Sequence, residues 1–138
     1  MTRFIDTNIL LYAVSVEAEE QSKRDQAVEV LQAVDLALSG QVLAEFYAQA
    51  TRPSRARHLT HTEAADFLEG LGRFPVHPVT AKLVLAAGRS SQRFQISYWD
   101  AAIIEAARAL ECEAVLSEDM QDGMDFGGVR VENPFAGV

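Results

Sequence analysis

The chain has 138 residues, 49% of them apolar and 23% charged, which is typical of one folded globular domain rather than a disordered chain. The 12 Lys and Arg residues are outnumbered by 20 Asp and Glu residues, and the formal net charge of −8 argues against broad electrostatic capture of nucleic acid. No apolar stretch approaches the roughly 20 residues of a membrane-spanning helix, and Asp6 and Asn8 interrupt any N-terminal secretory signal. Cys112 is the single cysteine, which excludes an internal disulfide, so we expect a cytoplasmic protein without a membrane partner.

Apolar spacing and capping residues predict short strands that alternate with helices along the chain. We expect strands at residues 3–6, 35–39, 74–77, 114–117 and 129–132. We expect helices at residues 7–14, 22–34, 41–51, 63–71, 80–93 and 98–110. Thr62 and Ser97 are the expected N-caps of the fourth and sixth helices. This alternation predicts a three-layer α/β fold over residues 1–138, with a short, mostly parallel sheet flanked by helices.

Four acidic residues are expected at one edge of this sheet. Asp6 ends the first strand, and Asp119 follows the strand at 114–117. Glu45 and Asp100 lie early in helices that begin at the same edge. Because ligand crevices in parallel α/β sheets open at the carboxyl ends of the strands, we expect the four carboxylates to meet in one pocket. Clustered carboxylates repel one another, and hard oxygen ligands suit Mg²⁺ or Mn²⁺, which activates water and stabilises phosphate oxygens.

Each acid also has a purely structural interpretation. Asp6 is in the place of a helix N-cap, and Asp100 follows Ser97 at the spacing of a capping box. Glu45 fits a solvated helix position, and Asp119 fits an ordinary loop. The shared location at strand ends and helix starts is a stronger signal than any one of the four.

Four ordered motifs then carry a family resemblance. FIDTNILLYA at 4–13, VLAEFYAQ at 42–49, SYWDAAIIEAA at 97–107 and LSEDMQDG at 116–123 resemble the PIN-domain nucleases, in particular their VapC-type toxin branch. The closing VENPF at 131–135 is also similar to the end of many such proteins. The resemblance covers essentially the whole chain. It implies a PIN-like fold, a metal-dependent endoribonuclease acting on RNA, a cognate antitoxin and a homodimer.

The resemblance also implies roles for individual residues. The positions that match the family's catalytic, metal-binding acids are Asp6, Glu45, Asp100 and Asp119, with Asp122 as a candidate outer acid. The hydroxyl and amide residues that resemble those bracing the acids are Thr7, Asn8, Ser97 and Ser117. Helix capping is the structural alternative for these four residues, and both roles are compatible.

Other segments carry weaker signals. Arg52, Arg55 and Arg57 belong to the most basic run, which is either an RNA phosphate contact or a solvated loop. We expect Trp99 in the core rather than in base stacking. His58 and His61 lack the further His or Cys ligands of a zinc site. Neither a phosphate-binding glycine loop nor a GxSxG elbow occurs.

The alternative function is a non-catalytic acidic α/β domain, either a silent PIN fold or a receiver-like phosphorylation module. A receiver is expected to place a lysine at a late strand end, but no lysine follows Lys82. A silent PIN fold should have lost at least one acid, and none of the four is missing. The sequence therefore favours the nuclease.

Overall fold

A computed structural model describes residues 2–138, and within that range five strands form one parallel sheet. The strands are β1 (Arg3–Ile5), β2 (Leu36–Ser39), β3 (Val76–His77), β4 (Ala114–Leu116) and β5 (Arg130–Glu132). Their order across the sheet is β3-β2-β1-β4-β5. Every pair is parallel, with Phe4 of β1 opposite Ala37 of β2 and Val115 of β4. Receiver-like folds have the order 2-1-3-4-5, so the receiver-like alternative is wrong.

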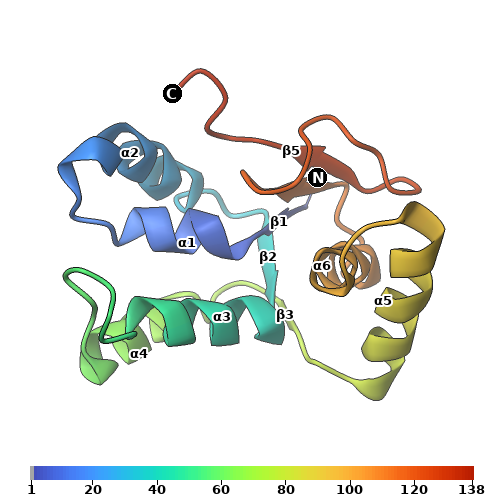
Figure 1. Ribbon diagram of the computed structural model, residues 1–138, viewed down its shortest axis with the longest axis horizontal. Coiled ribbons are helices and arrows are strands. Elements are labelled where there is room, and N and C mark those ends of the chain that lie inside the picture. Colours follow the sequence, from blue (N-terminus) through green and yellow to red (C-terminus); the bar gives the residue numbers. More distant parts are fainter. Residues whose placement is uncertain (1) are drawn as a thin grey trace.

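Helices cover both faces of this sheet and make the expected three layers (Figure 1). They are α1 (Thr7–Ala13), the short 3-10 helix η1 (Ala18–Glu20), α2 (Gln21–Val30), α3 (Gly40–Ala50), α4 (His61–Gly70), α5 (Ala81–Phe94) and α6 (Tyr98–Ala109). In Figure 1, α1 to α4 lie on one side of the sheet and α5 and α6 on the other. Helix α1 contacts α2 and α3, and α6 contacts α5, β2 and β4. No helix among residues 2–138 has the length and apolar character needed to cross a bilayer.

The core forms where the strands are buried on both faces. Phe4, Ile5, Leu38 and Val115 are fully buried, as expected for the nearly continuous apolar strands of a parallel sheet. Phe46 of α3 is also fully buried, and its ring packs 4.9 Å from the ring of Phe67 in α4. The central strands are therefore rigidly held at the edge where the acids follow them.

Two helix boundaries differ from the sequence expectation by more than one residue. The N-cap of α4 is Thr60, not Thr62, because the Thr60 hydroxyl accepts from the Glu63 amide and the Glu63 carboxylate accepts from the Thr60 amide. Helix α2 ends at Val30, because the next residues form tight turns in which the Ala33 amide donates to the Val30 carbonyl. Val34 consequently lies outside the helix and is 93% exposed.

Candidate active site

Asp6 is the buried acid of the site, and it sits where β1 passes into α1. Its backbone amide donates to the carbonyl of Leu116, 3.0 Å away, which fixes it beside the end of β4. Its carboxylate accepts hydrogen bonds of 2.7 Å from the Thr7 amide and the Ser117 hydroxyl. Burial, with smaller contributions from the charges of Asp119 and Glu45, raises the pKa of Asp6 to about 6 although the two hydrogen bonds lower it. Asp6 is therefore both the N-cap of α1 and a carboxylate whose ionised form is disfavoured by burial.

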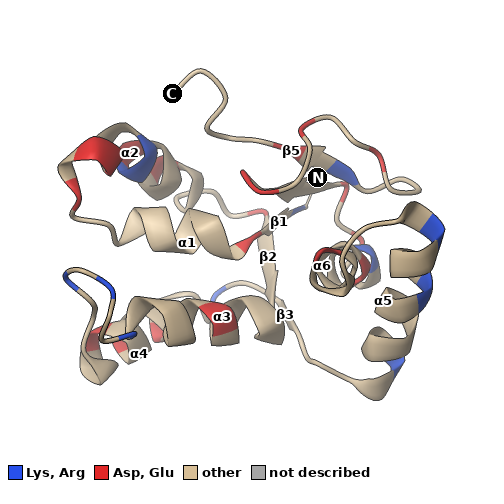
Figure 2. Cartoon of the chain, in the orientation of Figure 1, with Lys and Arg blue, Asp and Glu red and all other residues tan. Residues whose placement is uncertain are grey.

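The four predicted acids line one pocket of about 120 Å³. Glu45 reaches it from α3, Asp100 from the first turn of α6, and Asp119 from the loop after β4. Figure 2 shows acidic positions where α1 begins, on α3 and on α6, around the centre of the molecule. Burial raises the pKa of Asp100 and the charges of Asp119 and Glu45 raise it further, so the carboxylates act on one another across the pocket.

Neutral donors hold these acids in place. The Thr7 hydroxyl and the Gln41 amide donate to the two oxygens of Glu45, at 3.2 and 2.8 Å. The Asn8 amide donates to Asp119 at 3.2 Å and to the Ser117 hydroxyl at 3.4 Å. Each acid other than Asp100 thus accepts a side-chain hydrogen bond from a neighbouring element.

Asp100 is held through its backbone. Its amide donates to the Ser97 hydroxyl at 3.1 Å, and this bond caps α6. The structure therefore brings Thr7, Asn8, Ser97 and Ser117 into contact with the acids. Gln41 was not expected from the sequence, although its position four residues before Glu45 on a helix was an available signal.

Asp122 lies apart from this pocket. Its exposed carboxylate accepts from the backbone amide of Asn133 at 2.9 Å, which ties the glycine-containing loop to the residue after β5. Glu118, the residue before Asp119, pairs with Lys23 at 2.9 Å and accepts from the Tyr12 hydroxyl. Both acids thus have structural partners away from the four-acid pocket.

Trp99 is the clearest departure from the sequence expectation. It is 65% exposed rather than in the core, and it lines the acid pocket beside Asp100. The cause is its position in α6: the buried face of that helix is built from Ala101, Ala102 and the residues that follow, and Trp99 precedes them on the open side. Ile103, one turn later, is almost fully buried and forms part of the same pocket wall.

The donor set of the pocket fits a hard divalent cation. Its charged lining residues, within the described part of the chain, are all carboxylates, and none is Lys, Arg or His. Oxygen ligands of this kind suit Mg²⁺ or Mn²⁺ rather than zinc. Across residues 2–138, no three Asp, Glu, His or Cys side chains are grouped tightly enough to hold an ion as they stand. Mutual repulsion opposes a tighter grouping, so the carboxylates would draw together around a cation.

The histidines are elsewhere. His61 is hydrogen-bonded through Nδ1 to the Tyr47 hydroxyl at 2.8 Å, and Nδ1 of His58 contacts the carbonyl of Arg55. Cys112 is buried. The His58 and His61 side chains thus have hydrogen-bond partners outside the acid pocket.

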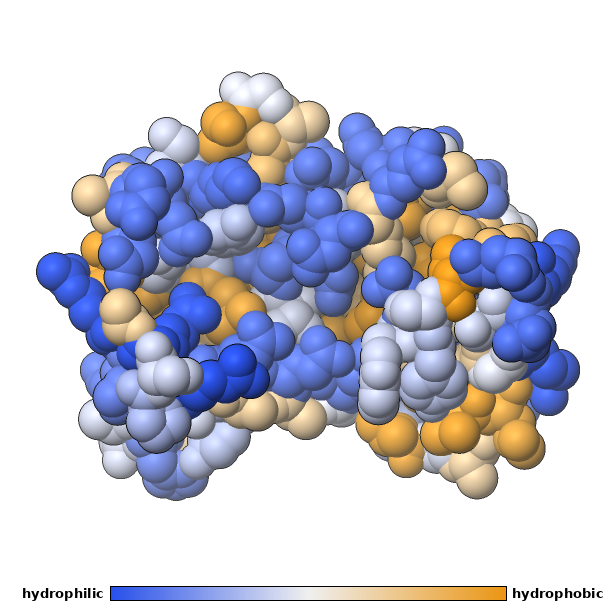
Figure 3. All heavy atoms as spheres, viewed as in Figure 1, coloured by the Kyte–Doolittle hydropathy of each residue, from blue (hydrophilic) through white to orange (hydrophobic). Residues whose placement is uncertain are grey.

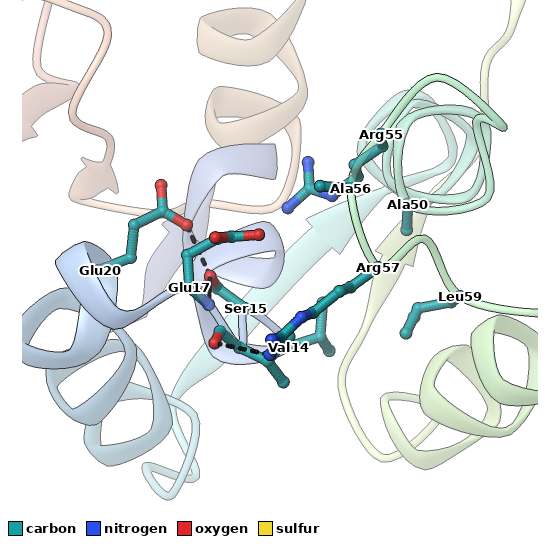
Figure 4. A pocket seen from close by; sticks show the side chains of 10 residues that line it. Val14, Ser15, Glu17, Glu20, Ala50, Arg55, Ala56, Arg57 and Leu59 are labelled. Atoms are coloured by element: carbon teal, nitrogen blue, oxygen red, sulfur yellow. Dashed lines mark hydrogen bonds between the residues drawn. The ribbon is translucent and has the colours of Figure 1, made fainter.

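The basic run forms part of a second pocket of about 200 Å³ (Figure 4). Arg55 and Arg57 line it, whereas Arg52 is exposed outside it. Arg57 donates to the carbonyl of Val16 at 3.4 Å, and within residues 2–138 none of the three arginines lies within 4.0 Å of a carboxylate oxygen. Glu17 and Glu20 line the other side of this pocket.

The two pockets follow each other along the contact between α1 and α3. The acid pocket reaches Leu11 and Gln49, and the second pocket begins at Val14 and Ala50. The arginines therefore lie at one end of the α1–α3 contact along which the acid pocket also lies.

Comparisons with known proteins agree with this architecture. The PIN domain family profile matches residues 3–122, so the chain belongs to the PIN domain family. A search of curated protein sequences found no significant match.

Solved structures show the same fold at low sequence identity. A toxin–antitoxin complex from Klebsiella pneumoniae is 18% identical with a TM-score of 0.69, covering 97% of this chain and 98% of that one. VapC20 of Mycobacterium tuberculosis, a sarcin–ricin loop cleaving toxin, is 20% identical with a TM-score of 0.66, covering 86% and 92%. VapBC2 from Rickettsia felis, bound to a DNA fragment from its promoter, is 19% identical with a TM-score of 0.63, covering 96% and 98%.

Proposed function

We propose that the chain is a metal-dependent endoribonuclease that acts as the toxin of a toxin–antitoxin pair. The observation that carries this proposal is the pocket itself: four carboxylates from four separate segments line it, and its described lining includes no basic side chain. Membership of the PIN domain family and the toxin–antitoxin neighbours support the same conclusion.

The proposed reaction is hydrolysis of an RNA phosphodiester bond. Asp6, Glu45, Asp100 and Asp119 would hold Mg²⁺ or Mn²⁺, which supplies an activated water and offsets charge on the phosphate. The raised pKa of Asp6 means that this carboxylate gains more from a cation than an exposed one does.

The neighbouring side chains orient the acids in this proposal. Ser117 donates to Asp6, Thr7 to Glu45 and Asn8 to Asp119, which leaves the remaining carboxylate lone pairs for a cation. A helix cap at Ser97 sets the position of Asp100.

The RNA strand would run from the acids along the contact between α1 and α3. Arg55 and Arg57 line the adjoining pocket and have no carboxylate partner within 4.0 Å among the described residues. A guanidinium without such a partner is available for a bidentate contact with phosphate. We therefore assign Arg55 and Arg57 to substrate binding, and we include Arg52 because it belongs to the same basic run, although it is exposed outside the pocket.

Two protein partners belong to the proposal. An antitoxin that inserts a basic side chain among the four carboxylates would satisfy their charge, and the net charge of −8 favours such a partner. A homodimer would cover apolar side chains at and before the first turns of α5, where Val79, Val84 and Leu85 are exposed. Figure 3 shows apolar surface at the end of the molecule where α5 lies.

Cleavage of RNA by the purified protein tests the function. The wild-type protein is expected to cut RNA in Mg²⁺ or Mn²⁺ and to lose activity in EDTA, because its carboxylates hold a cation. Asp100→Asn should be inactive, whereas Asp66→Asn, an exposed acid of α4 outside the pocket, should retain activity. Undiminished cleavage in EDTA, or by Asp100→Asn, would overturn the proposal.

A further inference from the structure

We propose that Trp99 is a stacking platform for an unpaired nucleobase beside the scissile phosphate, so that the site takes single-stranded RNA. This inference rests on the proposed function. It names which form of RNA the site selects and which residue selects it.

The position of Trp99 is the first observation. Its side chain is 65% exposed, whereas the large aromatic residues Phe4 and Phe46 are fully buried. An exposed tryptophan leaves a large apolar surface in water, which is unfavourable unless a ligand covers it. Trp99 lines the acid pocket next to Asp100. A base on this indole would therefore belong to a nucleotide close to the four carboxylates.

The orientation of Trp99 is the second observation. The rings of Tyr98 and Trp99 meet nearly perpendicularly, at 84° with centroids 5.0 Å apart. A perpendicular contact leaves at least one indole face free of Tyr98. Tyr98 packs on Ala87, Ala101 and Ala102, so its own ring is anchored between α5 and α6.

The backbone of Trp99 is also tied to the opposite wall of the pocket. Its carbonyl accepts from the Gln41 side chain at 3.4 Å, and the same amide group holds Glu45. The backbone that carries the indole is thus held in place before RNA arrives, which lowers the entropy cost of binding.

The chemistry of the pocket favours a base over a phosphate at this position. The neutral indole of Trp99 carries no charge that would hold a phosphate, but it attracts any base through its π-face. The amide of Gln49, in the same pocket, is available for the edge of that base. In a duplex both faces of each base are covered by its neighbours, so stacking on Trp99 requires an unstacked nucleotide. The occupant is therefore single-stranded RNA rather than duplex.

Fluorescence gives a direct test, because Trp99 is the only tryptophan in the chain. The Asp6→Asn variant, in which cleavage is blocked, is titrated with a single-stranded oligoribonucleotide and with the same sequence as a perfect duplex. We expect saturable quenching by the single strand and little by the duplex. Adding Trp99→Ala removes this signal, so the Kd of the variants is measured by the fluorescence anisotropy of a dye-labelled strand; it should rise about 5- to 150-fold, the equivalent of roughly 1–3 kcal/mol per stacked base. Trp99→Phe, which keeps an aromatic face, should lose less.

Steady-state cleavage by the wild-type protein provides the matching kinetic readout. Trp99→Ala should raise KM more than it lowers kcat, whereas Tyr47→Ala, an exposed aromatic of α3 outside the acid pocket, should change neither strongly. Circular dichroism confirms that each variant is folded.

The possible outcomes distinguish a failure of the stacking role from a failure of the proposed nuclease function. If the wild-type protein cleaves RNA while Trp99→Ala keeps its KM and the single strand causes no quenching, the stacking role is overturned and the nuclease stands. A Trp99→Ala variant that keeps its RNA affinity but releases a protein partner overturns it as well, in favour of a protein anchor. If nothing is cleaved, the proposed function fails, and the titration still decides whether Trp99 binds a base.

Discussion

Replacing Asp6 by Asn should make the metal-free protein more stable at neutral pH. Burial, assisted by Asp119 and Glu45, raises the pKa of Asp6 from 3.8 to about 6. This shift means that ionised Asp6 destabilises the folded protein by about 3 kcal/mol. Asn has nearly the shape of the carboxylate, and its side chain still has an oxygen to accept from the Thr7 amide and a nitrogen to donate to Ser117.

The sign of the pH dependence follows from the direction of the shift. Between about pH 4 and pH 6 the folded protein holds a proton on Asp6 that the unfolded chain has released, so wild-type stability falls as the pH rises. Below this window Asp6 is protonated in both states, and the penalty vanishes. The advantage of Asp6→Asn should therefore be small near pH 4 and reach about 3 kcal/mol, or roughly 10 °C in Tm, above about pH 7.

Urea and thermal unfolding in EDTA across this pH range measure the effect. Asp66→Asn, at an exposed position of α4, is the matched control and should show no such pH-dependent gain. If Asp6→Asn is instead less stable than the wild type near pH 7.5, the capping bonds to Thr7 and Ser117 outweigh the burial of charge. An advantage of equal size at all pH values would also refute the reasoning.

Metal binding, RNA binding and toxicity give three further predictions. Mn²⁺ at about 100 times its Kd is expected to stabilise the wild-type protein by about 2.7 kcal/mol in thermal unfolding; an equal gain in Asp6→Asn would contradict Asp6 as a ligand. Replacing Arg52, Arg55 and Arg57 together by Ala should lessen the salt dependence of RNA binding, by up to about 0.7 in log–log slope per lost phosphate contact, with Mn²⁺ affinity unchanged. An unchanged slope would identify the run as a solvated loop and direct attention to Arg89 and Arg93. Expression should arrest bacterial growth while Asp100→Asn should not, as colony counts after induction will show; equal toxicity of the two forms would rule out catalysis as its cause.

The convergence of the acids was predictable because it depends on local features. A carboxylate that directly follows a parallel strand must lie at the carboxyl edge of the sheet, which places Asp6 and Asp119 together. Glu45 and Asp100 follow from the helix starts at the same edge. These placements need only the order of strands and helices, and the alternating apolar pattern supplies that order.

Features that depend on tertiary packing were not predictable in this way. Trp99 was expected in the core, but it lies in the first turn of α6, before the buried residues that begin at Ala101. Helix α2 ends early because of tight turns after Val30, and no Pro or Gly in that segment indicates them in the sequence. The α4 boundary was different, since Thr60 and Glu63 stand at capping-box spacing and the sequence did contain that signal.

The chemical identity of the RNA ends tests the central claim, metal-assisted hydrolysis by the four-acid pocket, most directly. A defined single-stranded RNA is cut by the wild-type protein in Mg²⁺, and the new ends are identified by mass spectrometry and by their reactivity toward phosphatase and ligase. Attack by water held among Asp6, Glu45, Asp100 and Asp119 predicts 5′-phosphate and 3′-hydroxyl ends that disappear in EDTA and in Asp100→Asn. Ends bearing a 2′,3′-cyclic phosphate would show that the ribose hydroxyl is the nucleophile and would contradict the account.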